Sequence, residues 1–168
     1  MNMQDVRDLY DYNYWANRRI LRMAEQVTSE QFIAPSSHSY GSLQGTLVHT
    51  LGAEWSWRLL LEGQGVQPEL QAADFPTVAA VQQRWQEEER AMRGYLGGLR
   101  DEDLTGIVSY RGDTGILRER LVWHCLFHFH VVNHGMQHRS EAALLTGYGQ
   151  SPGEIDFTVF LNERTAHH

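Results

Sequence analysis

Residues 121–147 read LVWHCLFHFHVVNHGMQHRSEAALLTG and hold five of the chain's nine histidines. His130, His134 and His138 recur at every fourth position, and an α-helix turns by about 100° per residue, so the three imidazoles share one helix face. Zinc and the neighbouring transition metals favour neutral imidazole nitrogens as ligands. The stretch therefore predicts a helix that supplies two ligands to one metal ion. The spacing alone does not decide between His130 with His134 and His134 with His138.

A third ligand must come from another part of the chain, and His49 is the strongest candidate. It lies in a predicted helix over residues 43–62, and metal sites in helical bundles are built from side chains on facing helices. Mostly small side chains on the same face would leave space beside the imidazole, so we regard four residues as candidates for a substrate pocket: Gly52, Ala53, Ser56 and Trp57. Close packing of two helices is the alternative explanation for these residues. Three histidines with an open coordination position describe a catalytic type of metal site.

The composition restricts the classes of protein to which the chain can belong. Its 168 residues suit a single domain, and its formal charge of −7 argues against a general affinity for nucleic acid or anionic membranes. No apolar run approaches the roughly 20 residues that span a bilayer, and the single Cys125 excludes an intrachain disulfide. We therefore expect a soluble, cytoplasmic protein. His167 and His168 are left out of the site, as either a native tail or the remainder of a tag.

Helical periodicity of apolar residues dominates the sequence and predicts an all-α four-helix bundle with a crossover connection. The seam of the first helix includes Val6, Leu9 and Asn13, and Ser42 and Thr77 are suitable N-caps for the second and third helices. The predicted helices cover residues 3–26, 43–62, 78–99 and 117–146, with a short helical turn at 28–32, a crossover loop at 63–76 and a small β-hairpin at 106–115.

Polar residues occupy two inward positions of these helices. Asn13 and Glu88 interrupt apolar seams, and we regard both, together with His130, as candidates for supporting the metal ligands or facing the substrate. For Glu88 the favoured interpretation is a seam edge facing water, and the alternative is an inward group near the site. The other internal histidines are interpreted as packed, hydrogen-bonded residues: His38, His124 and His128.

The predicted fourth helix is apolar on two opposite faces. One face carries Trp123, Phe127, Val131 and Leu145, and the other carries Leu121, Cys125, Val132, Met136 and Ala143. A helix that is apolar on both sides is buried on both sides, which in a single-layer bundle requires a partner chain. We therefore expect a homodimer. The C-terminal apolar residues should pack back onto the bundle: Ile155, Phe157, Val159, Phe160 and Leu161.

Several familiar catalytic patterns do not fit the sequence. Zinc peptidases with the H-E-x-x-H motif need a glutamate where this chain has Gly135. The sequence contains no G-x-S-x-G motif, phosphate-binding loop or dinucleotide-binding fingerprint. Cys125 falls on the helix face away from His134, which argues against a cysteine–histidine nucleophile. Chemistry at a metal ion, through bound water or a bound thiolate, is therefore favoured.

Four stretches occur along the chain in a characteristic order. They are YNYWANRRIL at residues 12–21, SLQGTLVHTLGAEWSW at 42–57, HVVNHGMQHRSEAALL at 130–145 and GQSPGEIDF at 149–157. Together they resemble the DinB family of damage-inducible proteins, the YfiT-like metalloenzymes, which are unrelated to the DNA polymerase of similar name. The similarity spans essentially the whole chain.

The resemblance implies a usually dimeric four-helix bundle with a crossover, in which His49, His134 and His138 hold one divalent transition-metal ion per chain, such as zinc, nickel or iron. Characterised relatives include thiol-dependent S-transferases and a maleylpyruvate isomerase that uses a low-molecular-weight thiol. A metal-activated thiolate acting on a small-molecule substrate is therefore the leading mechanism. The stretch from His134 to Glu141 also resembles metal-binding domains of ergothioneine-pathway enzymes, in which the acid follows the second histidine by two residues.

Two classes of function remain open from the sequence. The first is a metal-dependent thiol S-transferase, with a metal-dependent hydrolase as its nearest variant. The second is a non-catalytic metal-binding or stress-response interaction protein, of a damage-inducible family, whose site has decayed or only stabilises the dimer. An open coordination position beside a pocket favours the first class, and a closed metal site favours the second.

Overall fold

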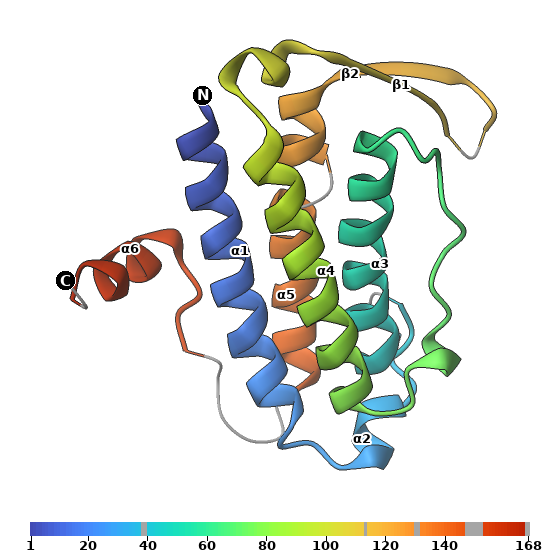
Figure 1. Cartoon of the computed structure of the whole chain (residues 1–168). Helices are drawn as coiled ribbons and strands as arrows, with labels where there is room; N and C mark the ends of the chain where they lie inside the picture. Colours follow the sequence, from blue (N-terminus) through green and yellow to red (C-terminus); the bar gives the residue numbers. More distant parts are fainter. Residues whose placement is uncertain (38–39, 113, 130–131, 147–152, 167–168) are drawn as a thin grey trace.

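The computed structural model of the protein describes residues 1–37, 40–112, 114–129, 132–146 and 153–166. Four long helices lie side by side (Figure 1): α1 (Met3–Ala24), α3 (Leu43–Leu61), α4 (Val78–Gly98) and α5 (Val132–Leu145). α1 packs against α4 and α5, and α3 packs against the same two helices. The connection from α1 to α3, which includes the short helix α2 (Ser29–Ile33), therefore runs between opposite corners of the arrangement. The expectation of a mostly helical protein with one small sheet is confirmed.

Three of the long helices begin at a side chain that accepts a hydrogen bond from the first helical turn. Asn2 and Asp5 form a reciprocal capping box at the start of α1. The predicted caps Ser42 and Thr77 are also confirmed, because their hydroxyl oxygens accept hydrogen bonds from the first turns of α3 and α4. The three helices end within two residues of the predicted positions. Short 3₁₀ helices lie in the loops before and after α4: η1 (Ala72–Asp74) and η2 (Asp101–Thr105).

The predicted hairpin is present and is longer than expected. β1 (Ile107–Arg111) and β2 (Leu117–Leu121) pair antiparallel, and the first residue of each strand faces the last residue of the other. Tyr110 of β1 packs edge-on against Trp57 of α3, with ring centroids 5.3 Å apart. The prediction of a helix from residue 117 is wrong, because pairing with β1 satisfies the backbone of a segment whose leucine, arginine and glutamate residues favour a helix locally.

A π-helical segment, η3 (His124–Phe129), separates β2 from α5. The predicted continuous helix therefore consists of a strand, a π-helical segment and α5. A π-helix uses i→i+5 hydrogen bonds and so changes the angle between successive side chains. The four-residue spacing of α5 consequently does not extend back to His124. His130 and His38 lie outside the described residues.

Two apolar clusters fill the space between the helices. The first includes Val6, Tyr10, Met92, Leu96 and Leu126, and the second includes Ile20, Leu47, Leu51, Val81 and Trp85. The C-terminal helix α6 (Phe157–Thr165) packs on the first cluster through Phe160, which is buried. The hydroxyl of Tyr12 donates a hydrogen bond to the Ile155 carbonyl oxygen at 2.8 Å. The expected return of the C-terminal segment onto the helices is thus seen in its described part.

The packing of a single chain already buries part of one of the two apolar faces predicted for residues 117–146. Cys125 and Val132 lie in the core, whereas Met136 and Leu144 are exposed. The homodimer stays a prediction. Within the described residues, every helix is too short or too polar to cross a membrane.

Candidate metal centre

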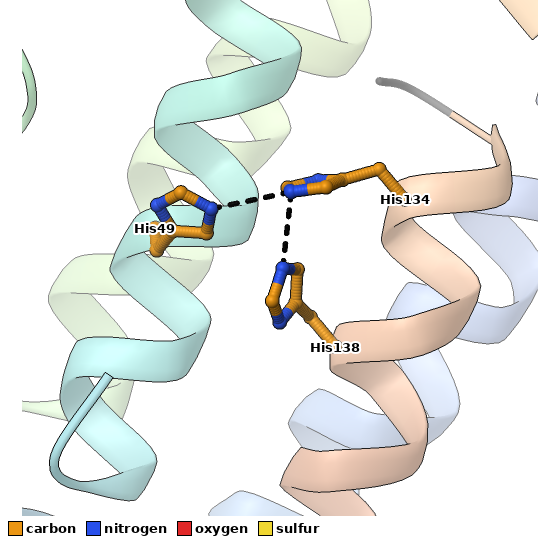
Figure 2. Close-up of side chains that lie close together, drawn as sticks. All are labelled: His49, His134 and His138. Carbon is orange, nitrogen blue, oxygen red and sulfur yellow. Dashed lines mark hydrogen bonds between the residues drawn. The ribbon is translucent and has the colours of Figure 1, made fainter. Parts of the chain in front are cut away.

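Three imidazole rings from two facing helices point toward one another (Figure 2). His49 projects from α3, and His134 and His138 project from successive turns of α5. The Nε2 atom of His134 lies 3.3 Å from Nε2 of His49 and 3.0 Å from Nε2 of His138. One nitrogen from each ring falls within 4.8 Å of the others, and His138 is buried while the other two are partly buried. The structure therefore brings together the three histidines singled out from the sequence, in an arrangement that could hold a metal ion.

The separations suit a tetrahedral metal ion. Zinc–nitrogen bonds of about 2.0–2.1 Å in tetrahedral geometry place two ligand nitrogens roughly 3.3 Å apart, close to the 3.0 and 3.3 Å found here. A neutral imidazole has one donor and one acceptor nitrogen, so three facing Nε2 atoms cannot all satisfy one another by hydrogen bonds. A cation between them would accept all three lone pairs. Three histidine ligands also leave the fourth tetrahedral position for water or substrate.

Glu141 forms a hydrogen bond with the ring nitrogen of His138 that points away from the other two histidines. The Oε2 atom of Glu141 lies 2.7 Å from Nδ1 of His138. Because a carboxylate accepts the hydrogen bond, Nδ1 carries the proton and Nε2 presents its lone pair to the other histidines. A hydrogen bond of this kind fixes the ring orientation of a metal-binding histidine. Glu141 therefore orients a ligand of the candidate site.

Tyr40 covers one face of His49. The two rings are stacked, with centroids 3.5 Å apart and an angle of 15° between their planes. His138 meets the same tyrosine ring edge-on at 5.4 Å. The approach depends on Gly45, because a Cβ atom there would collide with the carbonyl oxygen of Tyr40. Tyr40 thus limits access to the histidines from this side.

A pocket of about 330 Å³ opens beside His49, between α3 and the connection at residues 66–72. All four candidates from the sequence line it: Gly52, Ala53, Ser56 and Trp57. The side chain of Leu70 lies 3.5 Å from the point where a Cβ atom of Gly52 would stand. Close packing, the alternative to a substrate pocket, therefore explains Gly52 in part. The residue that packs there is Leu70 of the loop, and not a residue of a second helix.

A second polar cluster, the buried network, lies between the same helices and consists of Asn13, Asn17, Glu54, Trp85 and Arg139. One oxygen of Glu54 accepts hydrogen bonds from both asparagine amides at 2.9 Å, and the other accepts one from the Trp85 indole at 2.9 Å. The oxygens of Asn13 and Asn17 accept hydrogen bonds from Arg139 Nη1 at 2.6 and 3.0 Å. The network joins α1, α3, α4 and α5, and Arg139 directly follows His138. The inward orientation expected for Asn13 is confirmed.

Arg139 reaches this position because residue 135 is glycine. A Cβ atom on Gly135 would lie 2.8 Å from Nη1 of Arg139 and 3.3 Å from Oδ1 of Asn13. The position that would carry the glutamate of a zinc peptidase therefore admits a guanidinium group instead. Burial lowers the pKa of Arg139 and raises the pKa of Glu54, and the hydrogen bonds that Glu54 accepts oppose the rise.

Glu88 is buried, so the favoured expectation of a seam edge facing water is wrong. Its carboxylate accepts hydrogen bonds from Arg58 Nε at 2.6 Å and from Arg58 Nη2 at 2.9 Å, and Arg84 lies 3.8 Å away. This two-point pairing raises the pKa of Arg58. The carboxylate can be buried because α3 supplies a matching charge at the same level. Glu88 is thus an inward group, but its partners are arginines and not the histidines.

The chain's own thiol is unsuited to nucleophilic chemistry. Burial raises the pKa of Cys125 to about 11, so the reactive thiolate is scarce at neutral pH. A thiol-dependent reaction at this site would therefore use a thiol supplied from outside the chain.

His124 is packed against a neighbouring aromatic ring, as expected from the sequence. Its imidazole meets Trp123 edge-on, with ring centroids 4.0 Å apart.

Comparison with known proteins tests the resemblance to the DinB family. The model of the DinB family matches residues 1–166. The chain belongs to the DinB family. Protein DinB of Bacillus subtilis (strain 168) is 23% identical to it over 163 residues, which cover 92% of this chain and 94% of that protein. The DinB-family resemblance is thereby confirmed over nearly the whole chain.

Sequence reasoning missed two residues beside the DinB-family histidines, Tyr40 and Arg139. A signal for both is present in the sequence. Gly135 lies four residues before Arg139 in α5, and Gly45 lies four residues before His49 in the first turn of α3. Glycine is a poor helix former, so a helical glycine one turn before a site residue suggests a close approach of another group. In this chain the approaching groups are the Tyr40 backbone and the Arg139 side chain.

Proposed function

We propose that this DinB-family protein is a metal-dependent enzyme of the thiol S-transferase type. It binds one divalent transition-metal ion per chain, such as zinc, nickel or iron, through His49, His134 and His138. The observation that carries the proposal is the convergence of three Nε2 atoms beside a pocket of about 330 Å³. The four long helices are interpreted as the four-helix bundle of the family, and the active form as a homodimer.

Each residue around the proposed metal site has a separate role. The three histidines hold the ion, which as a Lewis acid would stabilise the thiolate form of a low-molecular-weight thiol. Glu141 keeps the proton of His138 on Nδ1, and Tyr40 screens His49 from water. The pocket beside His49 accommodates the thiol and a small electrophilic substrate. Cys125 does not compete with the external thiol, because its pKa is about 11.

A transfer assay tests the catalytic part of the proposal. The protein loaded with zinc, nickel or iron is mixed with 2-mercaptoethanol and the chromogenic electrophile 1-chloro-2,4-dinitrobenzene. We expect a thiol-dependent rate above background that requires the metal and is lost in His134→Ala. His124→Ala serves as the matched control, because His124 lies outside the cluster, and should retain the rate. Equal rates for the metal-loaded wild type, His134→Ala and the metal-free protein would contradict catalysis at this centre.

A further inference from the structure

The charge of the pocket beside His49 restricts the ligands that fit it. Among the described residues that line it, Glu69 is the one charged side chain. The other walls are apolar or neutral and include Tyr40, Trp57 and Leu70. An anionic ligand would therefore meet no positively charged side chain in this lining, and it would bring its charge close to a carboxylate.

Groups near the pocket strengthen this negative character. Glu141, whose Oε2 atom lies 2.7 Å from Nδ1 of His138, adds a second carboxylate near the three histidines. Arg58 follows Trp57 in α3, but its guanidinium group is bound to Glu88 and Glu62. The positive charge of Arg58, the arginine of α3, is therefore already paired with carboxylates and is not offered to the pocket.

We propose that Glu69 biases the pocket toward thiols whose second functional group is an amine and against thiols whose second group is a carboxylate or phosphate, while the attraction of the metal ion for the thiolate is common to all of them. This inference rests on the proposed function, because it concerns the thiol that would bind beside the metal centre. The chemical class is a small aminothiol or neutral thiol, and thiols that carry carboxylate or phosphate groups are disfavoured. The volume of about 330 Å³ lies at the small end of the range of ligand pockets, about 300–1,000 Å³, and suits a low-molecular-weight compound.

The size of the effect follows from the exposure of Glu69, which is a solvent-accessible residue. Two unit charges about 7 Å apart in water interact by roughly 0.6 kcal/mol, which corresponds to about a threefold change in affinity. We therefore expect Glu69 to strengthen binding of a cationic thiol about threefold and to weaken binding of an anionic thiol by a similar factor. Salt should reduce both effects, because the charge is exposed.

Thiol binding to the cobalt(II)-substituted protein provides the test. The absorption band of a cobalt-bound thiolate gives dissociation constants for three thiols of similar size: cysteamine, 2-mercaptoethanol and 3-mercaptopropionate. In Glu69→Gln, the affinity for cysteamine should fall about threefold and that for 3-mercaptopropionate should rise about threefold, with little change for 2-mercaptoethanol. Comparing each thiol between variants removes the differences in intrinsic thiol acidity.

Glu87→Gln is the matched control, because Glu87 is an exposed carboxylate of α4 outside the pocket lining. It should leave all three dissociation constants unchanged. Cobalt-bound thiolate bands whose dissociation constants are the same in Glu69→Gln and the wild type would overturn the selectivity and leave the proposed function standing. Failure to bind cobalt, or the absence of a thiolate band with every thiol, would overturn both proposals.

Discussion

The histidine cluster and the buried network occupy neighbouring positions on the same helices but differ in how their polar atoms are matched. In the network, the donors of Arg139, two asparagine amides and an indole face the acceptors of Glu54 and the asparagines at 2.6 to 3.0 Å. In the cluster, three nitrogens of the same kind face one another. The hydrogen bonds of the network therefore pair unlike groups within the chain, and only the Nε atom of Arg139 is left without a partner among its described atoms. The cluster instead sets nitrogens of one kind against one another, and a cation would accept their lone pairs.

This difference in hydrogen bonding predicts that the network affects the stability of the fold and that the cluster affects metal binding. The hydrogen bonds of the buried network contribute to the folded state whether or not a ligand is present. Binding of an ion to the histidine cluster stabilises the native state by an amount that grows with the logarithm of the ion concentration over its dissociation constant. Variants of the network should thus change stability with and without metal, and variants of the cluster should change stability only when metal is present.

Arg139→Met should give the largest effect. Removing the guanidinium group leaves buried Glu54 without its counter-charge and two asparagine oxygens without a donor, a change that costs about 3–5 kcal/mol in comparable cases. The free energy of unfolding in urea, measured with and without zinc, should fall by a similar amount in both conditions. Arg90→Met, at an exposed position of α4, is the control and should change stability by less than about 0.5 kcal/mol.

Glu141→Gln should weaken metal binding while the fold is retained. The amide is a poorer acceptor for the His138 Nδ1 proton, and loss of such a supporting carboxylate typically reduces metal affinity about 10- to 100-fold. Competition with a coloured zinc chelator measures the affinity. Urea unfolding of the metal-free variant should match the wild type, and a large loss of stability without metal would place Glu141 in the fold instead of the site.

Gly135→Ala should have the smallest effect and tests the link between the two regions. The added methyl group lies 2.8 Å from Arg139 Nη1, so the arginine must shift, which we expect to destabilise the protein by about 1–2 kcal/mol after the gain in helix propensity. Gly94→Ala is the control in α4, where no atom lies within 4 Å, and should be stabilising by about 0.5–1 kcal/mol. Equal effects at the two glycines would mean that Arg139 does not need this space.

Spacing in the sequence identified the histidine row of residues 130–138, because a helix converts a four-residue interval into a shared face. His49 was found from its place on a facing helix, and the set of three ligands was implied by the family resemblance. The choice of His134 with His138, which spacing left open, depends on which turn of α5 faces His49, and this is set by packing against α1 and α3. The caps and ends of α1, α3 and α4 were also predictable, since they depend on local hydrogen bonds.

Contacts between distant segments were not predictable in the same way. The segment 117–121 favours a helix locally, and only its pairing with residues 107–111 makes it a strand. Glu88 appeared water-facing because its partner Arg58 lies 30 positions earlier. Tyr40 has no periodic relation to His49, and its stacking arises from the close approach of its backbone to Gly45.

Metal content measured by mass spectrometry shows whether His49, His134 and His138 hold an ion. The protein, with His167 and His168 replaced by alanine, is exposed to zinc, nickel and iron and then desalted, alongside His49→Ala, His138→Ala and the control His124→Ala. We expect about one ion per chain in the parent protein and the control, and none in the two cluster variants. No metal in the parent protein, or the same metal content in His49→Ala, would contradict it.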